Sequence, residues 1–149
     1  MSSLLLTKIK EELNVALKAS NKEKVETLRF LLSEIGNYEI DKYPPSVKGE
    51  MTDEDVISVL QKQVKRHRES IEMFEKGARM DLVEKEKIEL GILQSYLPAQ
   101  MGEEEVRAKI KAIKDANSGG DFGSLMKLAI GELKGKVDGG LVSKILKEE

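Results

Sequence analysis

Residues 133–146 read LKGKVDGGLVSKIL, and this stretch decides how the C-terminal third of the chain folds. Gly135 and Gly139 bracket a Lys-x-Asp tripeptide between two short apolar segments. Glycine tolerates positive φ and lets a backbone approach a ligand closely. The pattern predicts a tight corner between two helices. Because the amides at a helix start favour anions, the same corner suits a phosphate-bearing partner. A plain helix–turn–helix corner is the commoner explanation of such a turn.

The segments on either side of this corner are typical of short amphipathic helices. We expect Gly135 to end a helix that Asp121 caps, and Asp138 to cap a final helix. Another helix is expected to begin at the three glutamates 103–105, which suit the positive end of the helix dipole. Each of these helices is too short to be stable alone in water. The sequence therefore predicts a C-terminal three-helix bundle.

The preceding residues predict four more helices, because apolar residues recur at three- and four-residue steps and no alternating strand pattern is found. They are expected over about 3–19, from a capping-box pattern at 20–23 to just before Pro44, from a cap at 52–55 to Gly77, and over about 79–96. The last of these is apolar on two faces and needs two neighbours. Pro98 and Gly102 then break the pattern. We predict an all-α fold with an N-terminal four-helix domain, residues 1–97, and a C-terminal three-helix domain, residues 98–149.

The composition excludes several classes of function. The formal net charge is −2, so any nucleic-acid binding must come from a local basic patch, and DNA is not an expected partner. The absence of cysteine excludes disulfides, zinc–thiolate sites and thiol catalysis. We find no signal-peptide pattern and no run of the ~20 apolar residues that a membrane span needs. These features predict a cytoplasmic protein with no membrane partner.

His67 is the only histidine, and it falls on the apolar stripe of the third predicted helix. We interpret it as a structural core histidine, because no serine or threonine in a nucleophile motif accompanies it. Acidic pairs such as Glu84 and Glu86 are interpreted as solvated faces or dipole complements. A lone histidine, no cysteine and no EF-hand spacing argue against a metal site. We therefore predict no catalytic residue, no metal and no cofactor.

Two basic clusters are candidates for binding a polyanion. The first covers residues 62–68 and shares helix faces with Glu69 and Glu72, so we interpret it as a solvated, partly compensated face. The second lies around the C-terminal corner and has fewer acidic neighbours. The RNA-binding residues that we predict belong to this second cluster: Lys127, Lys134, Gly135, Lys136, Gly139 and Lys144.

Several segments together resemble the YqeY family, whose fold also forms the C-terminal tail of GatB, a subunit of the tRNA-dependent amidotransferase. The resemblance covers essentially the whole chain and is fairly specific in the order and spacing of its segments. Val137 stands where the family usually has alanine, and Met101-Gly102 stands where a capping serine or threonine is common. The matching segments are TLR at 27–29, RMDLV at 79–83, YLPAQ at 96–100, DFGSLM at 121–126 and GKVDG at 135–139.

This resemblance implies two all-helical parts and a role in tRNA metabolism. In the amidotransferase, the tail domain is similar to the C-terminal part of this chain and engages the body of the tRNA. Family members often carry a label of carbon–nitrogen ligase activity with glutamine as amido-nitrogen donor. We interpret that label as a consequence of the likeness to the tail domain, which is part of the amidotransferase, and not as evidence of independent catalysis. The resemblance favours an accessory protein that binds tRNA through its C-terminal domain.

Two other functions remain open at this stage. One is a helical protein-interaction module that docks on an aminoacyl-tRNA synthetase or an amidotransferase through an apolar patch at Ile88 and Ile92. The other is a stand-alone amidotransferase, in which His67 is the only side chain available as a base near neutral pH.

Overall fold

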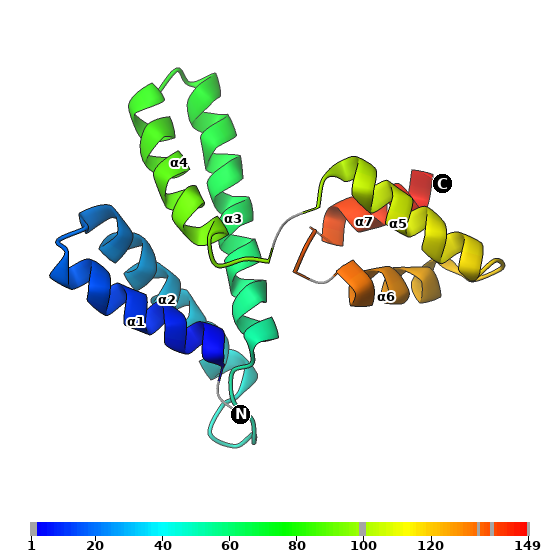
Figure 1. Cartoon of the computed structure of the whole chain (residues 1–149), viewed down its shortest axis with the longest axis horizontal. Coiled ribbons are helices and arrows are strands. Elements are labelled where there is room, and N and C mark those ends of the chain that lie inside the picture. Colours follow the sequence, from blue (N-terminus) through cyan, green and yellow to red (C-terminus); the bar gives the residue numbers. More distant parts are fainter. Residues whose placement is uncertain (1–2, 99–100, 134, 138, 149) are drawn as a thin grey trace. The chain divides into compact units, whose positions relative to one another are not determined.

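The computed structural model describes residues 3–98, 101–133, 135–137 and 139–148. Within these ranges the secondary structure consists of seven α-helices and no strand, which confirms the all-α prediction and its division into four helices followed by three (Figure 1). The chain divides into two compact units, which we call the N-terminal unit, residues 1–97, and the C-terminal unit, residues 98–149. The helices are α1 (Leu4–Lys18), α2 (Lys22–Lys42), α3 (Asp53–Lys76), α4 (Met80–Gln94), α5 (Glu103–Ala116), α6 (Phe122–Leu133) and α7 (Gly139–Glu148).

The N-terminal unit consists of two helical hairpins, α1–α2 and α3–α4 (Figure 1). The first hairpin turns at Ser20, which takes a positive φ of 55°. Asn21 is the N-cap of α2, and its side chain accepts a hydrogen bond from the Lys24 amide at 3.3 Å. The expected capping box at 20–23 is therefore wrong in detail, because the turn uses Ser20 and leaves the cap to Asn21.

A buried carboxylate joins the end of α2 to the start of α3. Asp55 forms a capping box with Thr52, and its side chain also accepts hydrogen bonds from Lys42 at 2.5 Å and from the Tyr43 hydroxyl at 2.8 Å. Burial alone would raise the pKa of Asp55, but these donors outweigh burial and hold that pKa well below its ordinary value. Asp55 therefore stays ionised and fixes the loop between the two hairpins.

All four helices contribute fully buried aliphatic side chains to the core of the N-terminal unit, including Ile9, Leu28, Leu60 and Leu93. The helix α4 packs against both α2 and α3, as its two apolar faces require. Among the described residues, no helix has the length and apolar character needed to cross a membrane.

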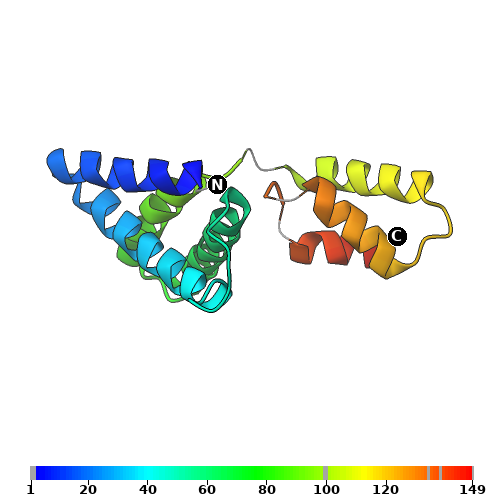
Figure 2. The ribbon, with the colours of Figure 1, turned by 90° about the horizontal axis from the view of Figure 1, so that it is seen from below.

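The C-terminal unit buries an aliphatic core between α5, α6 and α7, which pack against one another in Figure 2. Asp121 caps α6, since its side chain accepts a hydrogen bond from the Ser124 amide at 2.8 Å. Gly135 follows α6 with a positive φ of 78°, and the Lys136 amide donates back to the Leu133 carbonyl at 3.0 Å. The predicted corner therefore exists, and it reverses the chain after α6. The predicted cap at Asp138 lies outside the described residues.

Candidate functional site

The first candidate site is the corner between α6 and α7. Gly135 is buried, and its positive φ accounts for a glycine there without any ligand. Gly139 is exposed at the first residue of α7, and no atom lies within 4 Å of where its Cβ would be. The carbonyl of Lys136 accepts a hydrogen bond from the Met101 amide at 3.0 Å, which ties the corner to the residues just before α5.

The basic side chains predicted to bind RNA come from three places in the C-terminal unit. Lys127 lies on the exposed face of α6, Lys136 lies in the corner, and Lys144 lies on the exposed face of α7. None of these three ammonium groups forms an ion pair with another residue in the described part of the chain. Lys134, the fourth predicted lysine, lies outside that part. The structure therefore leaves three lysines open to an anionic partner.

The unit as a whole is not basic, because it holds nine Lys and Arg against nine Asp and Glu. Three of these acids, Glu103 to Glu105, occupy the first turn of α5, where Glu103 pairs with Arg107 at 2.9 Å. Any attraction of a polyanion must therefore come from how the lysines are placed and not from net charge.

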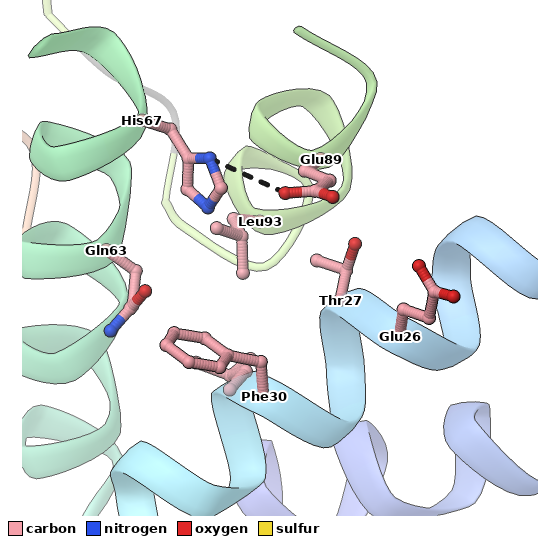
Figure 3. Close-up of a pocket in the computed structure, with 8 residues that line it drawn as sticks. Glu26, Thr27, Phe30, Gln63, His67, Glu89 and Leu93 are labelled. Atoms are coloured by element: carbon pink, nitrogen blue, oxygen red, sulfur yellow. Dashed lines mark ion pairs between the residues drawn. The ribbon is translucent and has the colours of Figure 1, made fainter. Parts of the chain in front are cut away.

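The second candidate site is a cavity of about 290 Å³ in the N-terminal unit, between α2, α3 and α4 (Figure 3). Phe30 and Thr27 of α2 face Leu93 of α4 across it. The Thr27 hydroxyl donates a hydrogen bond to the Glu23 carbonyl at 2.8 Å. The complete lining is Glu26, Thr27, Phe30, Leu31, Gln63, His67, Glu89 and Leu93.

His67 projects from α3 toward Glu89 of α4 (Figure 3) and also contacts Glu86 of the same helix. Its Nδ1 contacts the carboxylate of Glu86 and lies 3.8 Å from an oxygen of Glu89. The side chain of His67 is 14% exposed, so the half-buried position on the stripe of α3 is as expected, but its neighbours are acidic. The interpretation of Glu86 as a solvated acid is wrong, because α4 turns this side chain toward α3.

Two polar side chains in the lining of the cavity, Glu89 and Gln63, have unusual surroundings. Burial and the neighbouring Glu86 raise the pKa of Glu89 above its ordinary value. Gln63 is only 2% exposed, and its Nε2 has no hydrogen-bond partner among the described residues. A buried donor without a partner is costly, and Gln63 borders both this cavity and a second one between α2 and α3.

Sequence reasoning did not find this cavity, although one signal for it exists. The third and fourth helices meet in a hairpin at Gly77, and His67 lies about as far before this turn as Glu86 and Glu89 lie after it. In an antiparallel hairpin, residues equidistant from the turn face one another, and Glu86 and Glu89 share one helical face.

These features define a helical protein of two units, with an exposed set of lysines on one unit and, in the other, a cavity bordered by His67 and Glu89. The chain belongs to the YqeY family, because the family described as Yqey-like protein matches residues 6–149.

The chain is similar to several curated fungal proteins. It is 32% identical to Altered inheritance of mitochondria protein 41, mitochondrial, of Pyrenophora tritici-repentis, over 98% of this chain and 81% of that protein. It is 37% identical to an uncharacterized protein of Schizosaccharomyces pombe, over 60% of this chain and 69% of that protein. It is also 37% identical to the mitochondrial protein 41 of Eremothecium gossypii, over 63% of this chain and 49% of that protein.

These relatives correct the expected location. The composition and the absence of a leader pattern predicted a cytoplasmic protein. That prediction is contradicted by the relatives from Pyrenophora, Eremothecium and Kluyveromyces, which are named as mitochondrial proteins. An aliphatic, cysteine-free helical composition suits either compartment, so it could not separate the two.

Proposed function

We propose that the chain is an accessory protein of tRNA metabolism that binds tRNA through its C-terminal unit. The observation that carries the proposal is the exposure of Lys127, Lys136 and Lys144, none of which is ion-paired within the described part of the unit. The resemblance of this unit to the tail of GatB supplies the class of RNA. The two units then act as separate domains, with RNA binding assigned to residues 98–149.

Binding of this kind depends on phosphates and not on the reading of bases. Aromatic residues make up only 4% of the chain and tryptophan is absent, so stacking platforms are scarce. Phe122 is exposed, but the ammonium of Lys147 lies 5.8 Å from its ring centre. Each lysine–phosphate contact adds about 0.7 to 0.9 to the slope of log affinity against log salt. Three contacts therefore predict a slope of about −2 to −3.

The test compares two triple variants that remove the same charge from different units. The first is Lys127→Ala/Lys136→Ala/Lys144→Ala. The matched control is Lys62→Ala/Lys65→Ala/Lys76→Ala, whose lysines are exposed on α3. Binding of bulk tRNA is measured at about 50 and 200 mM salt, and the first variant is expected to lose at least about tenfold in affinity while the control changes little. An equal loss in both variants, or wild-type binding that ignores salt, would reject the proposal.

A second candidate is a protein-interaction module that docks through α4. Ile88 on this helix is 49% exposed, which favours an apolar contact there. Ile92 is half-buried against the core, so the available patch is smaller than the sequence predicted. Capture of a synthetase or an amidotransferase that survives ribonuclease and is lost in Ile88→Ser would support docking. Loss of the partner after ribonuclease treatment would assign the contact to RNA.

A further inference from the structure

We propose that His67, Glu86 and Glu89 bind one divalent transition-metal ion of the zinc type at the wall of the cavity between α2, α3 and α4. The site lies in the N-terminal unit and does not depend on RNA binding by the C-terminal unit.

The three side chains already converge on a common point. One ligand atom from each, the Nδ1 of His67 and one carboxylate oxygen from each glutamate, lies within 4.8 Å of the other two. Zinc bound about 2 Å from each of three tetrahedral ligands requires those atoms to be about 3.3 Å apart. All three residues are held on the packed helices α3 and α4, so rotation of the side chains has to supply that spacing.

The charge of the site matches a divalent cation. A metal binds deprotonated carboxylates and a neutral imidazole, so the three ligands together would carry a charge of −2. Glu26 of α2 adds a third carboxylate to the lining of the cavity. Lys85, which precedes Glu86 on α4, is exposed. Its charge attracts Glu89 from a distance, without a hydrogen bond. A metal ion satisfies both carboxylates and the imidazole together.

The buried amide of Gln63 lies beside the proposed metal site and also borders a second cavity, between α2 and α3. Gln63 lies one helical turn before His67 on α3, and Figure 3 shows both side chains bordering the cavity. Its Nε2 lacks a partner among the described residues although the side chain is almost fully buried. In Figure 3 the nitrogen points away from His67, and rotation about the last side-chain bond, which exchanges the two amide atoms, would turn the donor toward the metal site. Three protein ligands leave a fourth position of zinc open, and a water bound there would accept this hydrogen bond.

The donor set decides the class of metal. Imidazole suits zinc and its transition-metal neighbours, whereas magnesium and calcium prefer oxygen ligands alone. The chain has no cysteine, so a softer thiolate site cannot compete for the ion. We therefore expect Zn²⁺ to bind and an excess of Mg²⁺ to leave that binding unchanged.

The single histidine makes a direct test possible without any substitution. The full chain, without a polyhistidine tag, is titrated with Zn²⁺ while the imidazole ¹⁵N resonances are recorded. Only one imidazole is present, so every such signal reports on His67. Coordination is expected to shift Nδ1 selectively and to saturate at one ion per chain. Unchanged resonances at a tenfold excess of Zn²⁺, or equal shifts that match simple protonation, would overturn the proposal.

Three variants then assign the ligands by calorimetry. Glu86→Gln and Glu89→Gln each keep the shape of the side chain and are expected to weaken Zn²⁺ binding at least about tenfold. Glu84→Gln, an exposed acid on the same helix, is the matched control and should stay within about twofold of the wild type. Circular dichroism checks that each variant is folded. Zn²⁺ binding that is equally strong in Glu84→Gln and in the Glu86→Gln/Glu89→Gln double variant would refute the site.

Discussion

The polar side chains that matter for function lie between the helices in the N-terminal unit and on the surface in the C-terminal unit. In the N-terminal unit, polar side chains lie between the helices. Asp55 joins the end of α2 to the start of α3, and His67 of α3 contacts Glu86 of α4. The C-terminal unit has a core of aliphatic side chains, and its lysines lie on the outside of α6, the corner and α7. The first arrangement suits a small ligand held inside a unit. The second suits a large anionic partner that contacts a surface.

The difference also concerns what holds each unit together. Residues 98–149 are a small unit, and such units bury a smaller fraction of their surface than larger ones. They therefore rely on a few fully buried side chains and on one correctly shaped corner. The N-terminal unit is almost twice as long and adds a buried ionic network to its aliphatic core.

The largest expected effect is a destabilisation that unfolds the C-terminal unit while the N-terminal unit stays folded. Ile145 is fully buried in its core, and Ile145→Ala should lower the free energy of unfolding of this unit by about 3 kcal/mol. All three tyrosines lie in the N-terminal unit, so tyrosine fluorescence reports that unit while circular dichroism reports both. We expect an early dichroism transition and an unchanged fluorescence transition.

Ile130→Ala is the control for this comparison, because Ile130 is 40% exposed on α6 in the same unit. Ile130→Ala should lower the free energy of unfolding by less than about 1 kcal/mol, because the side chain buries little apolar surface when the unit folds. If Ile145→Ala instead moved both transitions together, the two units would fold as one body and the comparison would fail.

A smaller effect is expected in the N-terminal unit from Asp55→Asn. The substitution removes a buried charge that accepts hydrogen bonds from Lys42 and Tyr43, and should lower the free energy of unfolding by about 2 kcal/mol at pH 7. Because the pKa of Asp55 is lower in the folded than in the unfolded chain, its stabilisation is present above about pH 4 and is lost as the pH falls below that value.

Urea unfolding followed by tyrosine fluorescence at pH 7 and at pH 3 measures both effects. The difference between wild type and Asp55→Asn should shrink in acid. Asp41→Asn, an exposed acid near the end of α2, serves as the control and should change stability little at either pH. A difference that stays constant from pH 7 to pH 3 would show that ionisation of Asp55 is not the cause.

The smallest effect is the difference in stability between alanine substitutions at the two corner glycines, Gly135 and Gly139. Gly135→Ala places a side chain at a φ of 78° and should destabilise the C-terminal unit by about 1 kcal/mol. Gly139→Ala meets no atom within 4 Å and should change stability by less than about 0.5 kcal/mol. Thermal unfolding by circular dichroism measures both. Equal costs at the two positions would mean that the backbone of Gly135 is not what requires glycine there.

The helices were predictable from the sequence because their signals are local. Pro44, Gly77 and the Thr52 cap set helix ends within one or two residues of the observed ones. The corner at Gly135 was predictable for the same reason, since a short apolar helix followed by glycine is typical of this turn. The N-cap of α2 was not predictable in this way. Ser20 and Asn21 are both good caps, and the geometry of the turn decides between them.

The cavity was not predicted because it depends on contacts between helices. On α4 alone, Glu86 and Glu89 look like ordinary surface acids among lysines. Only the packing of α4 on α3 turns them toward His67, and only the proximity of α2 encloses the space with Phe30. The roles of the lysines stay a prediction, since exposure shows that they are available but does not identify a partner.

The most direct test of the account is to map the RNA contact on the whole protein. Amide resonances of the ¹⁵N-labelled chain are followed during titration with bulk tRNA at about 50 mM salt, where phosphate contacts are strong. The account predicts changes concentrated in α6, the corner and α7, with the amides of α3 and α4 unaffected. Changes centred on α2 to α4, or no changes at all, would contradict the assignment of RNA binding to the C-terminal unit.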